Sequence, residues 1–331
     1  MCIAVISSAH PDYPLILIDN RDEFLRRPTA PAAWWPEPYT YVLGSRDMAR
    51  AAHGTWLGVT KQGRIAVLTN YKESSSEAAV GQLSRGEIIN AFLELPPDGS
   101  VSTAEYVAQL IAGGEAQRAG GFSLVCGGVR GPLAVVSNRV CAAAGDGDGV
   151  EWVVRGKGET VALSNVAFGD CSWAKVREGE RMVKEALRES WKRGEGEGEL
   201  VQRLLGILST DTLPRLRGGG GLETYMDLLC ESIFIPVIGE EEEDRREEAE
   251  ICASNIHEKA EVMTNGAAAA GHMQYMKGLY GTQKQTVVLV HESGRVKFFE
   301  RTLYDDDAKP IPIGEGDRVF EFVAEESARE V

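Results

Sequence analysis

The sequence predicts an α+β protein in which helices lie outside stacked, mainly antiparallel β-sheets. Apolar, β-branched segments follow one another in pairs around short turns, which is typical of β-hairpins. Segments with helical periodicity fall into two blocks that separate three groups of strands. The 331 residues, 43% of them hydrophobic, are enough to bury a large core without disulfides or metal ions.

The chain opens with a predicted hairpin. Ile3–Ser7 and Leu15–Ile18 are apolar and rich in branched side chains, and a proline-containing turn separates them. If this turn is centred near Pro11, the residue numbers of two residues that pair across the antiparallel hairpin add up to about 22. Cys2 is therefore expected to lie near Asn20, within one or two residues of register.

The next segment, Pro28–Pro38, contains four prolines and is expected to be irregular. A second hairpin is predicted from His53–Thr60 and Arg64–Thr69. The first helix is predicted to begin after Ser84, because Ser84 and Glu87 have the spacing of a capping box.

The remaining elements follow the same two periodicities. In chain order they are the helix Ser102–Ile111, the strand pairs Phe122–Cys126 with Leu133–Ser137 and Glu151–Val154 with Thr160–Leu163, the helices Ser172–Trp191 and Leu200–Leu208, the hairpin Gly281–His291 with Val296–Leu303, and the strand Arg318–Val323. In the longest helix, Val176, Val183, Leu187 and Trp191 are predicted to form one apolar face.

We expect a single domain over residues 1–325, followed by a tail at 326–331. Segments rich in glycine, alanine or acidic residues are expected to be surface loops, namely 142–150, 215–221, 239–250 and 266–271. The third of these contains an acidic run that begins at Glu240, and such runs are typical of solvated loops.

Charge and cysteine usage exclude several classes of protein. The net charge of −15 argues against nucleic acid as a partner, because nucleic-acid-binding proteins usually present a basic face. None of the six cysteines forms a C-x-x-C pair, which favours reduced thiols and a cytoplasmic location. No apolar run approaches the roughly 20 residues of a transmembrane helix, and no basic region of a signal peptide is present. The five histidines are too scattered to predict a metal site, although His272 could ligate haem.

Cys2 is the first candidate for chemistry. If Met1 is removed, as is usual when a small residue follows it, Cys2 carries a free α-amine beside its thiol. An α-amine with a pKa of about 7.7–8.0 can act as general base for its own side chain, as in N-terminal nucleophiles. The alternative is a buried strand residue without a chemical role.

A polar cluster, Asn20-Arg21-Asp22-Glu23, follows the second apolar strand, and the hairpin register brings it beside Cys2. An arginine favours a thiolate, an aspartate can pair with a terminal ammonium, and an asparagine amide can donate to an oxyanion. Asn70 and Asn165 also come just after apolar strands and are expected to line the same cavity. Alternatively, each of these polar residues caps a turn.

A series of short motifs runs along almost the whole chain. They are Met1-Cys2-Ile3, Asn20-Arg21-Asp22-Glu23-Phe24 with Arg27-Pro28, Gly54-Thr55-Trp56-Leu57-Gly58, Thr69-Asn70-Tyr71, Ser84-Arg85-Gly86, Gly121-Phe122-Ser123-Leu124, Leu163-Ser164-Asn165 and Tyr280-Gly281-Thr282. Together they resemble the NRDE family, also called the Transport and Golgi organisation protein 2 family. The resemblance implies a four-layer αββα sandwich like that of the N-terminal nucleophile hydrolases, with a distant similarity to bile-salt and penicillin V acylases.

The resemblance also implies roles for individual residues. Cys2 matches the nucleophile, Arg21 and Asp22 resemble its charged supports, and Asn70 and Asn165 resemble oxyanion and substrate-orienting positions. The residues expected to contact a ligand are Asn20, Arg21, Asp22, Glu23, Trp56, Tyr71 and Lys284.

One position departs from the family pattern. Gln283 stands where many relatives have an arginine, and the neighbouring Lys284 can replace its charge but not its planar fork. This substitution counts against conserved hydrolase chemistry.

Three functions follow from the resemblance. The first is a cytosolic carrier or chaperone for haem or an acyl-CoA-like ligand, linked to Golgi organisation and protein secretion. The second is a Cys2 amidohydrolase or thioesterase acting on an N-acyl or acyl-CoA substrate. The third is an interaction factor that binds partner proteins at secretory membranes.

No cofactor is expected to be required, since haem would be a transported ligand. We expect the protein in the cytoplasm, in association with the Golgi or mitochondria. A cavity beside Cys2 wide enough for a macrocycle would favour the carrier, and a tight cavity with a free Cys2 amine would favour the hydrolase.

Overall fold

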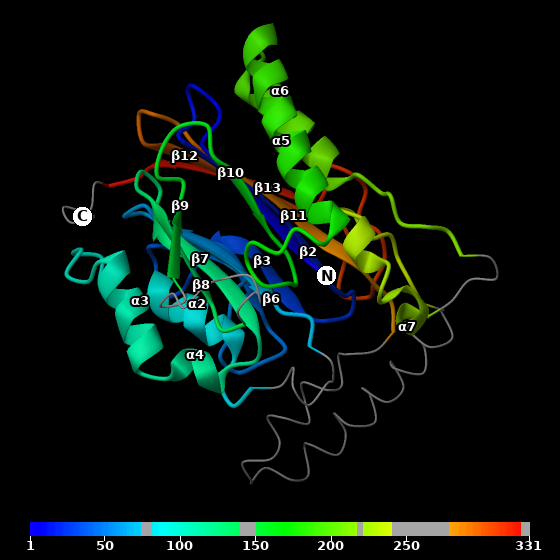
Figure 1. Ribbon diagram of the computed structural model, residues 1–331, viewed down its shortest axis with the longest axis horizontal. Helices are drawn as coiled ribbons and strands as arrows, with labels where there is room; N and C mark the ends of the chain where they lie inside the picture. The colour runs from blue at the N-terminus through cyan, green and yellow to red at the C-terminus, as the bar shows by residue number, and fades with distance from the viewer. Residues whose placement is uncertain (74–80, 140–149, 217–220, 240–277, 326–331) are drawn as a thin grey trace.

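The computed structural model describes residues 1–73, 81–139, 150–216, 221–239 and 278–325, and Figure 1 shows two stacked β-sheets between two groups of helices. In this part of the chain one sheet has six strands and the other has seven, and all neighbouring strands are antiparallel. The predicted α+β fold, with antiparallel sheets inside and helices outside, is confirmed.

The six-stranded sheet contains the N-terminal hairpin. Its strands, in spatial order, are β10 (Thr160–Leu163), β1 (Ile3–Ser7), β2 (Leu15–Phe24), β11 (Tyr280–Val290), β12 (Arg295–Thr302) and β13 (Asp317–Val323). Ile3 pairs with Asn20, so the register differs by one residue from a hairpin centred at Pro11. The shift brings Cys2 level with Arg21, at the polar end of β2.

The seven-stranded sheet follows chain order. Its strands are β3 (Thr29–Trp34), β4 (Val42–Asp47), β5 (Leu57–Thr60), β6 (Arg64–Asn70), β7 (Phe122–Gly128), β8 (Leu133–Ser137) and β9 (Val150–Val153). The expectation of an irregular segment at Pro28–Pro38 is wrong, because β3 occupies most of it. An edge strand tolerates Pro31, and the pairing with β4 is irregular between Ala30 and Ala33.

The strand pair predicted from Glu151–Val154 and Thr160–Leu163 does not form. β9 pairs with β8 in one sheet, whereas β10 pairs with β1 in the other. Between them Val154 adopts a φ of 56°, and its N–H donates to Glu159 Oε2 at 2.8 Å. This short connection therefore carries the chain from one sheet to the other instead of closing a hairpin.

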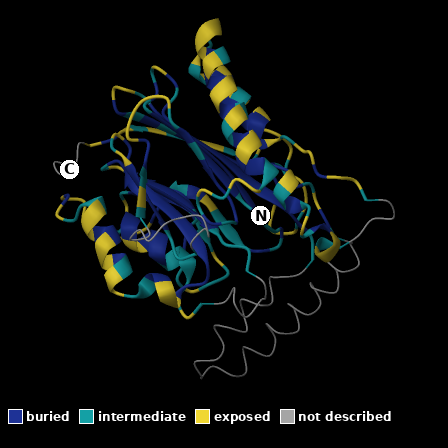
Figure 2. Ribbon diagram, viewed as in Figure 1, coloured by how far each residue is buried: buried dark blue, intermediate teal, exposed yellow. Residues whose placement is uncertain are grey.

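Helices form the two outer layers. The six-stranded sheet is covered by α5 (Ala174–Arg193) and α6 (Glu197–Leu208), and the seven-stranded sheet by α2 (Arg85–Leu93), α3 (Thr103–Ala112) and α4 (Glu115–Arg118). Two short helices, α7 (Leu222–Tyr225) and η1 (Leu229–Glu231), follow α6. A third core fills the space between the sheets, where Leu17 and Val67 belong to one apolar cluster. Figure 2 shows buried strands between helices whose outer faces are exposed, which is a four-layer αββα arrangement.

The predicted cap of α2 is confirmed, whereas α5 begins at Ala174 instead of Ser172 and α6 at Glu197 instead of Leu200, and one apolar position differs. Ser84 precedes α2, and its N–H donates to Glu87 Oε2 at 2.9 Å, as a capping box requires. Val183 and Leu187 of α5 are buried, whereas Trp191 is 51% exposed. Trp191 lies in the last turn of α5, and its ring forms a T-shaped pair with the His10 ring at 5.8 Å between centroids.

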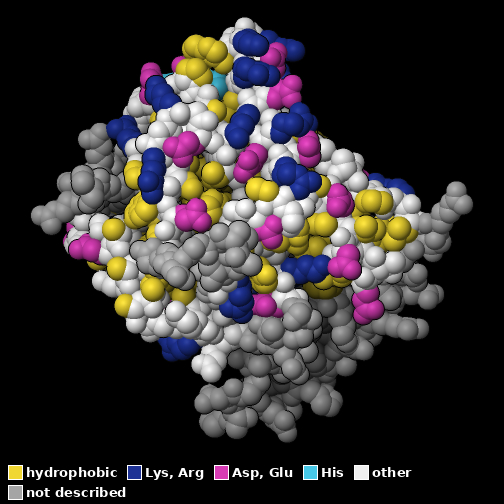
Figure 3. Space-filling view, in the orientation of Figure 1, with side chains coloured by type: hydrophobic (Ala, Val, Ile, Leu, Met, Phe, Trp, Pro, Cys, Tyr) yellow, Lys and Arg dark blue, Asp and Glu magenta, His cyan; other side chains and the backbone are white. Residues whose placement is uncertain are grey.

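Several expectations concern residues that are not described. The loops 142–149, 217–220, 240–250 and 266–271, the tail 326–331, His272, Cys141 and Cys252 all lie outside the described residues. In the described part, no helix is both long and apolar enough to cross a membrane. Figure 3 shows basic and acidic side chains interspersed over one face of the molecule, so neither sign of charge dominates there.

Candidate functional site

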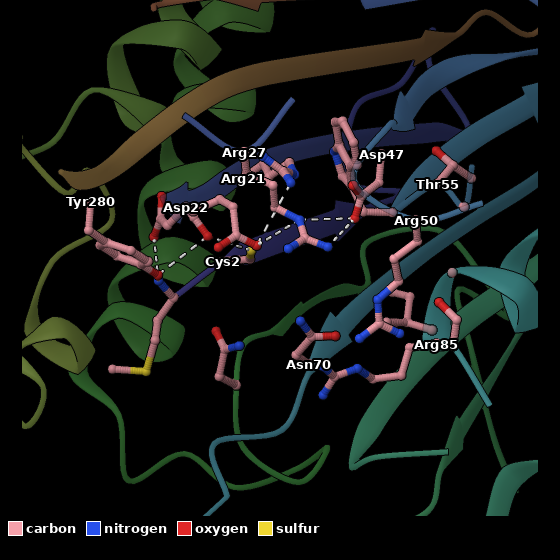
Figure 4. A pocket seen from close by; sticks show the side chains of 18 residues that line it. Cys2, Arg21, Asp22, Arg27, Asp47, Arg50, Thr55, Asn70, Arg85 and Tyr280 are labelled. Carbon is pink, nitrogen blue, oxygen red and sulfur yellow. Dashed lines mark hydrogen bonds and ion pairs between the residues drawn. The ribbon is translucent and has the colours of Figure 1, made fainter. Parts of the chain in front are cut away.

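A cavity of about 200 Å³ lies beside the N-terminus, between the polar ends of strands from both sheets. Its lining residues are Met1, Cys2, Arg21, Asp22, Glu23, Arg27, Asp47, Arg50, Gly54, Thr55, Trp56, Leu68, Asn70, Ser84, Arg85, Gly86, Asn165 and Tyr280. The structure thus places all five residues considered for catalysis, Cys2, Arg21, Asp22, Asn70 and Asn165, around one cavity (Figure 4 labels the first four).

Close backbone packing fixes one wall of this cavity. A Cβ atom on Gly54 would lie 2.6 Å from the Cα of Gly86, and a Cβ on Gly86 would lie 2.8 Å from the Cα of Gly54. Neither position has room for a side chain, because both contacts are with backbone. The first turn of α2, where Arg85 begins the helix, is therefore held against the loop that carries Thr55 and Trp56.

The N-terminal residue is anchored at three points. The Met1 amine lies 3.2 Å from Asp22 Oδ2 and donates to the Tyr280 hydroxyl, and the Met1 carbonyl accepts from Lys175 Nζ (Figure 4 labels Asp22 and Tyr280). Lys175 is fully buried, and its Nζ lies 3.8 Å from Asp22 Oδ2. Burial lowers the pKa of both the Met1 amine and Lys175, although Asp22 opposes the shift.

Cys2 presents a thiol rather than a thiolate. Its Sγ lies 3.7 Å from the backbone oxygen of Asp22, to which it donates. Burial raises the pKa of Cys2 to about 11, and the neighbouring amine offsets this only in part. In the described chain the Cys2 nitrogen is part of the peptide bond with Met1, so it cannot act as a general base.

Arg21 is held by three groups between the sheets. Its Nη1 donates to Gln283 Oε1, its guanidinium lies 4.5 Å from the centroid of the Trp56 ring, and its Nη2 lies 3.8 Å from Glu23 Oε2. Gln283 in turn donates to the backbone oxygen of Leu25 at 3.1 Å. The amide oxygen of Gln283 therefore accepts a hydrogen bond from Arg21, whereas an arginine at position 283 would repel the Arg21 guanidinium.

The two asparagines approach from different sheets. Asn70 ends β6, and Asn165 follows β10. The backbone oxygen of Asn165 accepts from Lys72 N–H at 2.7 Å, whereas its buried side-chain Oδ1 has no hydrogen-bond partner among the described residues. Next to it, Ser164 Oγ donates to the Cys2 carbonyl at 2.7 Å, which ties this loop to the N-terminus.

Three residues expected to contact a ligand lie elsewhere. Asn20 is fully buried on the other face of β2, where its Nδ2 donates to the carbonyls of Leu208 and Ile233. Side chains alternate along a strand, so Asn20 and Arg21 face opposite ways. Lys284 is buried between the sheets at 3.4 Å from Glu300 Oε1 and donates to Thr302 Oγ1 at 2.9 Å. Tyr71 does not line the cavity either, since it packs beside Gly121.

Sequence comparison assigns the chain to a family. The model of the family described as Transport and Golgi organisation 2 matches residues 1–305. The chain belongs to this family. It is 28% identical over 296 residues to the Transport and Golgi organization 2 homolog of Mus musculus, covering 89% of this chain and 88% of that protein. It is 27% identical over 300 residues to the human homolog, with the same coverage. The family resemblance in the motifs is confirmed.

Solved structures with low similarity include two amide hydrolases. The N-acylethanolamine-hydrolyzing acid amidase ortholog of Caenorhabditis elegans matches with a TM-score of 0.39 and 14% identity, over 61% of this chain and 85% of that chain. The penicillin V acylase of Agrobacterium tumefaciens matches with a TM-score of 0.37 and 12% identity, over 97% and 86%. Similarities this weak carry no inference about activity.

Several residues of the site were not among the predicted ones. Three of them, Arg27, Arg85 and Tyr280, stand in motifs shared with the family, and these motifs could have identified them as site residues. Arg50 and Lys175 stand in no such motif, and only the fold brings them to the N-terminus. Among the described residues, no group of three or more His, Cys, Asp or Glu side chains is arranged to hold a metal ion.

Proposed function

We propose that this protein binds an anionic acyl compound of the acyl-CoA type in the Cys2 cavity and carries it without cleaving it. One observation carries the proposal. Four arginines, Arg21, Arg27, Arg50 and Arg85, line a cavity of about 200 Å³ beside the Cys2 thiol. Such a surface suits a ligand that has both an oxyanion and a neutral acyl group.

The size of the cavity favours a linear ligand over haem. Pockets that enclose drug-sized ligands usually have volumes of about 300–1,000 Å³. A cavity of about 200 Å³ is smaller, so it accepts one end of a flexible chain while the rest stays outside. A rigid macrocycle could insert only a propionate edge. Haem trafficking therefore remains the less favoured form of the carrier proposal.

The state of Cys2 favours binding over turnover. A thiol with a pKa of about 11 is almost entirely protonated near neutral pH, and the thiolate is the nucleophile. The amine nearest to it belongs to Met1 and is engaged by Asp22 and Tyr280. Both features support a carrier as long as Met1 is present.

A second candidate, a Cys2 thioesterase or amidase, is favoured by the shared position of Cys2, Asn70 and Asn165 around one cavity. Loss of Met1 would give Cys2 an α-amine that takes the thiol proton. The sulfur would attack the acyl carbonyl, the substrate C–S or C–N bond would break, and the leaving thiol or amine would take that proton. Water would then cleave the acyl-Cys2 thioester, releasing a carboxylic acid and the free thiol.

The names of the mammalian relatives support a cellular setting for this carrier. We place it in the cytoplasm, where ligand delivery would serve Golgi organisation and protein secretion. Association with mitochondria or with partner proteins at secretory membranes belongs to the same proposal.

The test is calorimetric titration of the full chain with octanoyl-CoA, followed by chromatography of the mixture for released CoA. Intact mass first establishes whether Met1 is present. Cys2→Ala is compared with Cys171→Ala, which removes an exposed thiol outside the cavity. The carrier predicts saturable binding, no CoA release, and similar affinity for both variants. Release that disappears only in Cys2→Ala would establish the thioesterase instead, and absence of binding would overturn both candidates.

A further inference from the structure

Two arginines of the cavity form no direct ion pair with a carboxylate among the described residues. Asp47 Oδ2 accepts from Arg27 at 2.7 and 3.0 Å, and Glu23 Oε2 lies 3.8 Å from the same guanidinium. Within the described ranges, Arg50 and Arg85 form no ion pair with any carboxylate. The acidic groups of the cavity are thus paired with other cations.

These two arginines come from separate elements and meet on one side of the cavity. Arg50 lies in the loop after β4, and Arg85 is the first residue of α2. Figure 4 shows both with Asn70, on the side of the pocket away from Tyr280, and Cys2 lies between the two sides. One edge of the Arg85 guanidinium is fixed, since its Nη1 donates to the backbone oxygen of Gly121 at 3.3 Å.

Bringing these two cations together has an electrostatic cost. Burial and the nearby charge of Arg50 together lower the pKa of Arg85 to about 10, although Glu23 and Glu73 oppose the shift. Burial and the charge of Arg27 also lower the pKa of Arg50, and the carboxylates of Asp47, Glu87 and Glu23 oppose that shift. Both remain protonated at neutral pH. A bound anion would offset their repulsion and their loss of hydration.

We propose that Arg50 and Arg85 form an anion subsite that binds a phosphate or carboxylate group of the ligand. The inference rests on the proposed ligand-binding function of the cavity. A guanidinium is planar and presents paired N–H donors that match both oxyanions. The Asn70 side-chain amide lines the same side and supplies a further donor.

The experiment compares ligands on the wild-type full chain before any variant is used. Octanoyl-CoA carries phosphates, octanoyl-pantetheine has the same thioester without them, and N-octanoylglycine carries a carboxylate. Dissociation constants are measured by calorimetry at two salt concentrations. We expect octanoyl-pantetheine to bind at least about tenfold more weakly than octanoyl-CoA and with less salt dependence. Comparable binding of N-octanoylglycine would identify a carboxylate as the bound anion, and weaker binding would identify a phosphate.

Variants then locate the subsite. Arg50→Gln and Arg85→Gln should each weaken octanoyl-CoA about tenfold or more and leave octanoyl-pantetheine unchanged. Arg188→Gln, on the exposed face of α5, removes the same charge away from the cavity and should change neither. If a glutamine variant does not fold, Arg85→Lys is measured in its place. Its affinity for octanoyl-CoA should lie between that of wild type and that expected for Arg85→Gln. Equal binding of the two thioesters by wild type would overturn the subsite while leaving the proposed function standing. Absence of binding for all ligands would overturn the function itself.

Discussion

Replacing Asp22 by asparagine tests the buried charges around the N-terminus. The Asp22 carboxylate is fully buried, with Oδ2 at 3.2 Å from the Met1 amine and 3.8 Å from Lys175 Nζ. Its Oδ1 accepts from Thr282 Oγ1 at 2.7 Å. Asparagine has the same shape and keeps an oxygen for Thr282, so the substitution removes mainly the charge. Two buried cations are then left without an anion.

The expected loss of stability is large. Removing one partner from a buried ion pair costs about 3–5 kcal/mol, because the remaining charge stays desolvated. Unfolding entropy of about 2.1 cal/mol/K per residue gives roughly 0.7 kcal/mol/K for a chain of this length. The melting temperature of Asp22→Asn should therefore fall by about 4–7 °C at neutral pH.

The loss should depend on pH in a defined direction. Burial already lowers the pKa of the Met1 amine from 8.0 and that of Lys175 from 10.5, and without Asp22 both fall further. The folded variant then releases protons at pH values where the unfolded chain still holds them. The difference in stability between Asp22→Asn and wild type should therefore become smaller as the pH increases, first toward 8.0, the ordinary pKa of the amine, and then toward 10.5, that of lysine.

Scanning calorimetry of purified variants between pH 6 and 10 measures both effects. Asp227→Asn is the matched control, since Asp227 pairs with Lys72 at 2.7 Å but is 96% exposed, and its melting temperature should stay at the wild-type value. The double variant Asp22→Asn/Lys175→Met should recover part of the loss, because it also removes one of the two stranded cations. A decrease below about 1 °C, or a decrease independent of pH, would show that Asp22 does not stabilise two buried cations.

Three further outcomes are expected. Hydrogen bonds from basic side chains of β12 outweigh the effect of burial and lower the pKa of Glu197 to about 2. The ionised Glu197 therefore stabilises the fold above about pH 4.5, and this contribution is lost as the pH falls toward 2. In thermal melts, the melting temperature of Glu197→Gln should fall less on acidification than that of wild type. Iodoacetamide should modify Cys2 far more slowly than the exposed Cys171 at pH 8, as measured by peptide mass spectrometry, with a rate that rises toward pH 11; equal rates would contradict the raised pKa of the Cys2 thiol. Gly54→Ala should lower stability by about 1–3 kcal/mol in denaturant titrations and weaken ligand binding, because its Cβ meets the backbone of Gly86; unchanged binding would show that this wall does not position Arg85.

Local patterns were enough to predict much of the fold. The apolar runs on either side of Pro11 set the β1–β2 register to within one residue, because turn position fixes antiparallel pairing. That register also brought Cys2 beside Arg21 and Asp22. The edge strand β3 escaped prediction because a proline such as Pro31 is tolerated in a strand only where one side of that strand is unpaired.

Contacts between distant segments could not be read from local patterns. Spacing along the chain made β9 and β10 look like a hairpin, whereas the structure places them in different sheets. Lys175 meets the Met1 carbonyl only because α5 packs on the sheet that contains β1. Arg50 likewise reaches the cavity from a loop without a motif, and no periodicity marks such a position.

Native mass spectrometry of the full chain mixed with octanoyl-CoA shows whether the protein carries the ligand intact. The mass of the complex distinguishes a bound ligand from a covalent acyl-enzyme, and Arg85→Gln serves as the comparison. A carrier should give a species with the mass of the protein plus intact octanoyl-CoA, and this species should be strongly reduced in Arg85→Gln. A species with the mass of the protein plus the octanoyl group alone, located at Cys2, would contradict the carrier function.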